Sequence, residues 1–251
     1  MKDVPPDYYV RLHAVEQQHW WHGGMRAITA ALLEPELACG HLALLDAGCG
    51  TGGFLAWAAQ TGAFDRLCGV DISAEAVEFA RRGVPDTDVQ LAPLHALPYD
   101  DATFDLVVLN DVLQHVDERL IDSAVRDLHR VLRDGATLLV RTNGGRRAHR
   151  VRADWRLYDA RLLREDLERG GFRLERLTHA NAVLSAWGSL RGRVPRAPTA
   201  TTCGISATPG AFVNRVGSAL LGLEARYLRN ARRSLPYGHT LFALAVRLGD
   251  A

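Results

Sequence analysis

The sequence predicts an α/β fold built on a doubly wound, mainly parallel sheet, and three observations lead to this prediction. Short apolar runs alternate along the 251-residue chain with segments of helical period, the pattern of a parallel sheet with helices on both faces. The run at 104–109 is almost continuously apolar, which is typical of a strand buried on both sides. A glycine-rich stretch at 48–53 follows the first apolar run and precedes a helical pattern, so the chain turns there from strand to helix.

The other elements follow from the same patterns and from capping residues. Strands are predicted at 42–46, 66–71, 89–92, 104–109, 136–141, 172–177 and 240–248. Helices are predicted at 53–61, 73–83, 118–133 and 159–170, with one or two aromatic-rich helices at 5–35. Ser73 and Asp159 suit helix starts, whereas Gly135 and Gly170 suit helix ends. The chain is therefore divided into an N-terminal helical cap at 1–40, a core at 41–180, an insertion at 181–239 and a final core strand at 240–251.

Two acidic residues flank the glycine-rich loop. Asp46 ends the first strand just before the first glycine, and Asp71 ends the second strand, 21 residues after Gly50. Glycine lets a ligand approach the main chain closely, and an acid at the second position accepts hydrogen bonds from ribose hydroxyls. Gly48, Gly50 and Gly53 also fit the dinucleotide pattern G-x-G-x-x-G, so the loop by itself leaves a nicotinamide dehydrogenase open.

Five motifs stand in order along the core. They are LDAGCGTG at 45–52, GVDIS at 69–73, LPYDDATFDLV at 97–107, NDVLQHV at 110–116 and LHRVLRDG at 128–135. Together they resemble the class I S-adenosylmethionine (SAM) dependent methyltransferases, in the type 11 group that includes ubiquinone- and menaquinone-type enzymes. The resemblance covers roughly residues 42–177. It implies a Rossmann-like sheet of seven strands with the last one antiparallel, SAM as cofactor and S-adenosylhomocysteine as product.

The resemblance also implies which residues hold the cofactor. The glycine loop of the family holds the methionine part of SAM, and the acid after the second strand holds its ribose. The implied contacts are Asp46, Gly48, Gly50, Asp71, Ile72, Leu94 (through its backbone), Asn110, Trp21 and Arg26. Two departures stand out: Arg26 is offset by one place from the family's pattern, and Pro93 replaces the acid that usually accepts from the adenine amino group. We therefore expect weaker binding at the adenine end.

The candidate catalytic and substrate residues lie near the predicted cofactor loop. His115 follows the fourth strand, and His19 lies in the cap; either imidazole has a pKa range suited to a general base, and either could instead be structural. Tyr9, Asn143 and Tyr158 are expected to line the substrate pocket. The spacing of histidine, cysteine and acidic residues shows no metal-ligand constellation, and no metal is expected.

The cap and the insertion leave alternatives open. His19-Trp20-Trp21 either folds over the cofactor, as in part of the family, or is hydrophobic packing. The insertion at 181–239 is either a substrate-pocket element, with a lid at 188–210, or a dimerisation arm. A helix is predicted at 211–230, with one apolar face formed by Phe212, Val213, Val216, Leu220, Leu223 and Tyr227.

Arginines are clustered in three regions of the sequence. They are Arg141, Arg146, Arg147, Arg150, Arg152 and Arg156; Arg191, Arg193 and Arg196; and Arg226, Arg229, Arg232 and Arg233. The plainer interpretation is a solvated face in an arginine-biased chain. The sharper one is recognition of an acidic substrate, because guanidinium groups match carboxylate and phosphate groups bidentately.

The composition of the chain limits the classes of partner that are expected. A net charge of +1 gives no general attraction to nucleic acid or to anionic membranes, and no apolar stretch is long enough to span a bilayer or to act as a leader. The expected protein is a cytoplasmic monomer or homodimer that methylates a small molecule, including acidic ones, in bacterial specialised (natural product) metabolism. The alternatives are a SAM-binding enzyme of the same fold that catalyses a non-methylating rearrangement, and a non-catalytic partner subunit.

Overall fold

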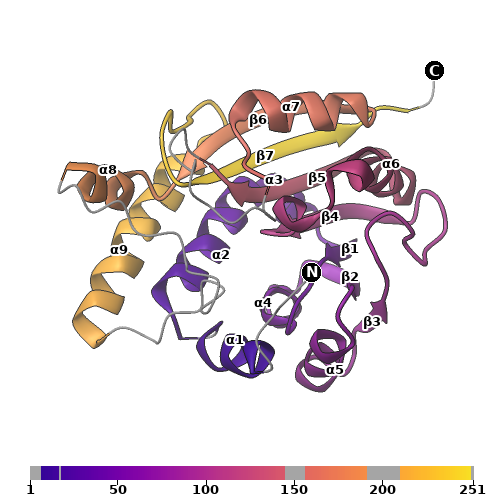
Figure 1. The fold of residues 1–251 in the computed structure, drawn as a ribbon, viewed down its shortest axis with the longest axis horizontal. Coiled ribbons are helices and arrows are strands. Elements are labelled where there is room, and N and C mark those ends of the chain that lie inside the picture. Colours follow the sequence, from indigo (N-terminus) through magenta and orange to yellow (C-terminus); the bar gives the residue numbers. More distant parts are fainter. Residues whose placement is uncertain (1–6, 17, 145–155, 191–209, 250–251) are drawn as a thin grey trace.

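The computed structural model describes residues 7–16, 18–144, 156–190 and 210–249. Figure 1 shows one twisted sheet with helices on both of its faces. None of the helices in these segments is long and apolar enough to cross a membrane.

Seven strands form the sheet in the order β3-β2-β1-β4-β5-β7-β6. They are β1 (Leu42–Ala47), β2 (Phe64–Asp71), β3 (Asp88–Leu91), β4 (Phe104–Asn110), β5 (Leu132–Asn143), β6 (Phe172–Ala180) and β7 (Thr240–Arg247). All neighbouring pairs from β3 to β5 are parallel, whereas β7 runs antiparallel to both β5 and β6. The predicted sheet, including its antiparallel last strand, is confirmed.

The helices lie between and around these strands. They are α1 (Tyr8–Glu16), α2 (Trp20–Leu32), α3 (Glu34–Cys39), α4 (Gly53–Ala59), α5 (Ala74–Gly83), α6 (Ile121–Val131), α7 (Ala160–Arg169), α8 (Ala182–Leu190) and α9 (Ala211–Leu228), with short 3-10 helices η1 (Leu113–His115) and η2 (Glu118–Leu120). Ser73 and Asp159 cap α5 and α7, as the sequence predicts: each side chain accepts a hydrogen bond from a backbone N–H of the first turn.

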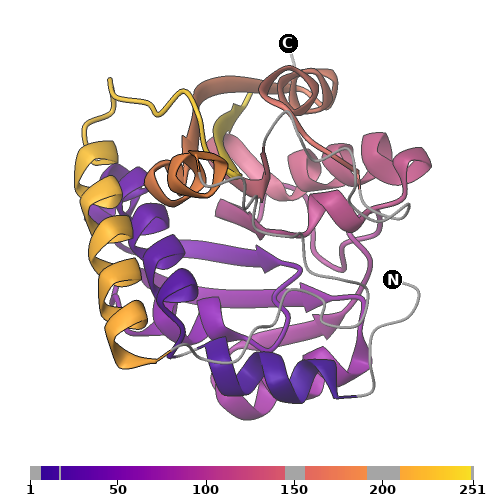
Figure 2. The ribbon, with the colours of Figure 1, turned by 60° about the vertical axis from the view of Figure 1, so that its left-hand side comes forward.

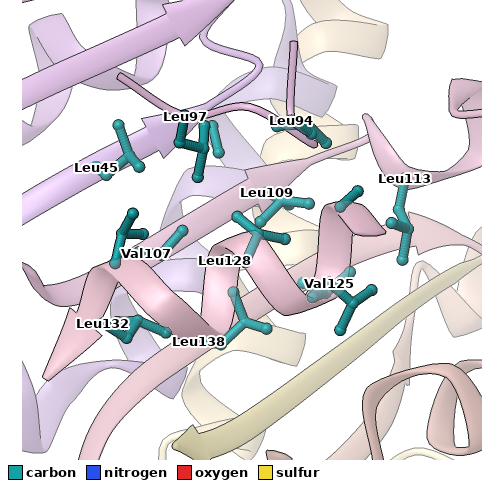
Figure 3. Close-up of a cluster of buried hydrophobic side chains, with 14 of the residues drawn as sticks. Leu45, Leu94, Leu97, Val107, Leu109, Leu113, Val125, Leu128, Leu132 and Leu138 are labelled. Atoms are coloured by element: carbon teal, nitrogen blue, oxygen red, sulfur yellow. The ribbon is translucent and has the colours of Figure 1, made fainter. Parts of the chain in front are cut away.

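Alternate side chains of the central strands point to opposite faces, and each face has its own helices. Leu45, Val107 and Leu138 pack with α6 and α7 on one side, and Figure 3 shows them around Val125 and Leu128 of α6. Their neighbours along the strands pack with α2, α4 and α9 on the other side. Burial on both faces explains why 104–109 is almost continuously apolar. The parallel strands end together at one edge, which positions the polar residues that follow them.

Helix α9 lies alongside α2 (Figures 1 and 2), so the insertion and the cap contact each other. Glycine permits this close approach: a Cβ at Gly24 would collide with Leu221, and a Cβ at Gly217 would collide with the Trp20 ring. The face of α9 that packs inward carries Gly217, Leu221, Glu224, Ala225 and Leu228.

The apolar residues predicted to share a face of α9 do share one, but that face is not the one that packs inward. Most of its members are largely exposed: Phe212, Val213, Val216, Leu223 and Tyr227. Both sides of α9 carry apolar residues at helical spacing, and the small residues that fit α2 decide which side is buried. The predicted lid at 188–210 lies almost entirely outside the described residues.

A second correction concerns Gly135. The sequence places it at the end of a helix, but α6 ends at Val131 and the chain enters β5 at Leu132. Gly135 lies within β5 with φ +76°, in a stretch where the β4–β5 register shifts. Glycine is favoured there because the backbone is left-handed, not because a helix stops.

Candidate active site

The glycine loop joins β1 to α4 at the carboxyl edge of the sheet. Gly48, Gly50 and Gly52 have φ values of +87°, +54° and +84°, which other residues rarely adopt. The backbone N–H groups of Gly48 and Cys49 donate to the Val70 carbonyl at 2.7 and 2.9 Å, so the loop is held against β2. The predicted strand–turn–helix is therefore present, with its glycines at the positions that need them.

Asp71 fastens the same loop from the end of β2. One carboxylate oxygen accepts a hydrogen bond from the Gly50 N–H and the other from the Ser73 N–H, both at 2.9 Å. Burial raises the pKa of Asp71, and the three backbone N–H groups around it lower that pKa. The next residue, Ile72, has a side chain that is 61% exposed, so it is available to an adenine ring. Leu94 turns its side chain into the core, leaving its backbone for such a contact.

Asp46 and Asn110 lie at the ends of the neighbouring strands β1 and β4, and they are not saturated with partners. Asp46 is only 1% exposed, yet its Oδ1 atom has no hydrogen-bond partner among the residues that the structure describes. The same holds within those segments for both polar atoms of the Asn110 amide. A buried polar atom without a partner carries a free-energy cost, so this pair is suited to a polar ligand.

The charges around Asp46 also favour a ligand at this position. Burial raises its pKa from 3.8 to about 8, and the charge of Glu16 adds to this effect while Arg141 opposes it. The Asn110 amide also lowers the pKa somewhat, from a position that does not complete a hydrogen bond. The site at this edge therefore favours a cationic group next to Asp46.

Helix α1 covers the loop through Glu16, a residue that the sequence analysis missed. The Thr51 hydroxyl donates to Glu16 Oε2 at 2.5 Å, and a Cβ at Gly53 would collide with the Glu16 carboxylate. One turn earlier, Leu12 reaches Gly50. Glu16 precedes Thr51 by 35 residues and belongs to no motif, so only its place in an amphipathic cap could have drawn attention to it.

The cap also meets the end of β5. The Arg141 guanidinium donates to Asp111 Oδ2 through Nε at 3.0 Å and Nη2 at 2.7 Å, and it lies 5.1 Å from the centre of the Trp21 ring. Arg26, which the resemblance assigns to the cofactor, donates through Nη1 to the backbone carbonyl of Glu16 at 3.2 Å. Burial, together with the positive charge of Arg141, lowers the pKa of His22 to about 3, so this imidazole is neutral. The sequence pattern gave His22 no role, and it indicated Arg141 only as a member of an arginine cluster.

The two candidate bases have different surroundings. His19 Nδ1 accepts a hydrogen bond from the Trp21 N–H at 3.1 Å and caps α2, and burial lowers its pKa. His115 lies in η1, half-buried, with its Nε2 3.4 Å from the amide nitrogen of Gln114. Gln114 in turn accepts from the Thr142 hydroxyl and the Asn143 N–H, which fixes η1 against β5. The Nδ1 atom of His19 is therefore engaged at the start of α2.

Two of the three predicted pocket residues are engaged in packing. Tyr158 is only 2% exposed and donates its hydroxyl to Asp166 at 3.1 Å, which argues against a place in the substrate pocket. The Asn143 amide donates to the Arg156 carbonyl and accepts from the Tyr158 N–H, so both of its ends are used to hold that segment. Tyr9 lies buried on α1, with its ring edge-on to Tyr8 at 5.0 Å.

Several of the clustered arginines have partners in the fold. Arg141 pairs with Asp111, Arg156 with Asp166 at 3.1 Å, and Arg229 with Glu34 at 3.5 Å. Arg146, Arg147, Arg150, Arg152, Arg191, Arg193 and Arg196 lie outside the described residues. The described pairs stabilise the fold, so an acidic substrate stays a prediction.

Known proteins resemble this chain over its core. Residues 45–140 match the family described as methyltransferase domain. Malonyl-[acyl-carrier protein] O-methyltransferase of Enterobacter lignolyticus is 34% identical over 162 residues, which are 59% of this chain and 63% of that protein. Ubiquinone/menaquinone biosynthesis C-methyltransferase UbiE of Geobacter sp. is 30% identical over 104 residues, 39% of this chain and 43% of that enzyme. The chain thus spans less than two thirds of the length of either relative.

Among solved structures, the [4+2]-cyclase SpnF superposes with a TM-score of 0.60 at 21% identity, over 90% of this chain and 82% of that one. At this identity the likeness concerns the fold. The five motifs, the sheet order and the matched segment agree with one another, and they identify residues 45–140 as a methyltransferase domain.

Proposed function

We propose that this protein transfers the methyl group of SAM to a small molecule. The observation that carries the proposal is the pair of buried, unpartnered polar groups of Asp46 and Asn110 directly behind the glycine loop. Such groups are costly unless a ligand satisfies them, and they stand where the family binds its cofactor.

In this proposal each strand end has one task. The glycine loop and Asp46 hold the methionine part of SAM, Asp71 accepts from the ribose hydroxyls, and Ile72 covers the adenine ring. SAM supplies a methyl group on a positively charged sulfur, which carries the hard chemistry. The protein then has to align the acceptor atom with that methyl group, an effect worth on the order of 7–11 kcal/mol in well-oriented systems.

We favour His115 over His19 as the general base for acceptors that arrive protonated. The Nδ1 atom of His19 caps α2, so moving a proton there would disturb the start of that helix. His115 follows β4 at the edge where parallel strands present their ligands. Replacing a general base typically lowers turnover by 10²–10⁴-fold. His115→Asn should do so, and it should flatten the low-pH limb of the pH profile of kcat.

The acceptor that we propose belongs to bacterial specialised metabolism. The names of the two relatives include an O-methyltransferase and a C-methyltransferase, so the first acceptors to test are a malonyl thioester and a quinol. The assay measures S-adenosylhomocysteine and the mass of the acceptor together. Equal amounts of methylated product and S-adenosylhomocysteine are expected.

Asp46→Asn tests the cofactor site, and Asp86→Asn, at an exposed position, is the matched control. Loss of SAM binding in the first variant alone is the expected result. If the acceptor is converted without release of S-adenosylhomocysteine, the rearrangement alternative replaces methyl transfer. If the wild-type protein fails to bind SAM in a calorimetric titration, the proposal is wrong.

A further inference from the structure

Glu16 is a half-buried acid that none of the family motifs explains. It ends α1, and its carboxylate lies against the glycine loop, where it accepts from the Thr51 hydroxyl and fills the space in front of Gly53. Its backbone carbonyl accepts from Arg26 Nη1, which fixes the turn between α1 and α2. Glu16 is therefore held through its carboxylate by Thr51 and through its backbone by Arg26.

A second acid, Asp46, makes it costly in free energy to hold both carboxylates ionised. The charge of Glu16 raises the pKa of Asp46, so the two carboxylates disfavour each other's ionisation. Burial raises the pKa of Glu16 itself, although the Thr51 hydrogen bond and the charges of Arg26, His13 and Arg141 lower it. Asp46 Oδ1 is fully buried and lacks a partner in the described part of the chain, so the pair is incomplete as it stands. A cation bound between the two acids would relieve the repulsion and satisfy that oxygen.

The position of Glu16 in the fold indicates which cation would bind between the two acids. Thr51 and Gly53 belong to the glycine loop, the part of the fold that holds the methionine end of SAM in this family. The ribose acid, Asp71, is on the neighbouring strand end and is engaged by Gly50 and Ser73. An ammonium group can donate three hydrogen bonds, enough for a carboxylate on each side.

We propose that Glu16 binds the α-ammonium group of SAM opposite Asp46, so that α1 supplies one side of the cofactor site. The proposal rests on the SAM-dependent function given above. It makes the cap a part of cofactor recognition through a specific residue rather than through aromatic packing alone.

The experiment compares Glu16→Gln with the wild-type protein by calorimetric titration against three ligands. SAM carries the ammonium and the sulfonium, S-adenosylhomocysteine carries the ammonium alone, and 5′-methylthioadenosine carries neither. Glutamine keeps the size of the side chain and its contact with Thr51 but removes the charge. The hydrogen bond to a charged group predicts that SAM and S-adenosylhomocysteine bind roughly 10- to 100-fold more weakly. The affinity for 5′-methylthioadenosine should stay unchanged, which also shows that the variant is folded.

Glu78→Gln is the matched control, because Glu78 is an exposed acid on α5 that pairs with Arg82 at 3.8 Å. It should bind all three ligands like the wild-type protein. Unchanged affinity of Glu16→Gln for SAM overturns the inference, as does an equal loss for all three ligands, which would indicate a structural role. A loss for SAM alone also overturns it, because the charge would then face the sulfonium. In each of these cases the wild-type protein still binds SAM, so the proposed function stands; failure of wild-type binding defeats both.

Discussion

Asp46 is held in the fold at a cost that depends on pH. Its pKa is about 8 in the folded protein against 3.8 ordinarily, so between these values the folded state binds a proton that the unfolded state has lost. Its contribution to the free energy of unfolding therefore falls as pH rises, by up to about 1.4 kcal/mol per pH unit. Asp46→Asn removes this component. Relative to the wild-type protein, the variant should gain stability from pH 5 to pH 8, measured by urea unfolding without SAM.

The control for this prediction is Asp86→Asn, which changes an exposed acid. Its stability should follow the wild-type protein at every pH. Parallel curves for Asp46→Asn and wild type would mean that Asp46 is not protonated in the folded state. The neighbouring charges that shape this result are Glu16 and Asp71, which raise the pKa, and Arg141, which lowers it.

The hydroxyl of Tyr158 allows a test of whether this residue serves packing or substrate binding. Its hydroxyl donates to the buried Asp166, which also accepts from Arg156. Tyr158→Phe should lower the free energy of unfolding by about 1–3 kcal/mol, because a buried acceptor loses one donor. Affinity for SAM and turnover should stay near the wild-type values. A variant with unchanged stability but altered turnover would instead return Tyr158 to the substrate pocket.

At the scale of elements, the contact between α2 and α9 depends on the absence of a side chain at one of two adjacent glycines. A Cβ at Gly24 would collide with Leu221, whereas a Cβ at Gly23 would meet open space. Gly24→Ala should lower the free energy of unfolding by about 1–3 kcal/mol through overpacking. Gly23→Ala, in the same helix, should raise it by about 0.5–1 kcal/mol, because alanine restricts the unfolded chain. Thermal unfolding of the pair measures both, and shifts of the same sign would contradict the packing.

Two leucines of α9 test which face of that helix is buried. Leu221 is fully buried against α2, whereas Leu223 is 65% exposed. Leu221→Ala should cost about 2–5 kcal/mol, the range for buried leucines. Leu223→Ala should change the free energy of unfolding by less than about 0.5 kcal/mol. A larger loss from Leu223→Ala would mean that the apolar face with Leu223 is the buried one and that the orientation of α9 is wrong.

Across the whole molecule, the features that could be predicted from the sequence are those that residues close together in the chain determine. The loop after β1, the acid at Asp71 and the helix caps are set by residues close together in the chain. The Glu16–Thr51 contact and the pairing of Arg141 with Asp111 join distant segments, and no periodicity reports them. The buried face of α9 could not be predicted, because both sides of the helix carry apolar residues. Glu224 added to the difficulty, because an acidic residue is expected to face solvent. In the fold Glu224 is buried, and its carboxylate accepts from the Asn181 and Val183 N–H groups at the start of α8.

The link between the cap and the cofactor should be visible in the dynamics of the whole chain. Helix α1 has nine residues, too few to persist alone in water, so its stability depends on contacts such as those of Glu16 and Leu12 with the glycine loop. A ligand at 100 times its Kd stabilises the folded state by about 2.7 kcal/mol. With SAM at that excess, the amides of α1 should exchange with deuterium markedly more slowly. Those of α7, which packs with α6 against one face of the sheet, should slow only as far as the global stability rises. Slower exchange at α7 with no change at α1 would mean that the cap does not close on the cofactor.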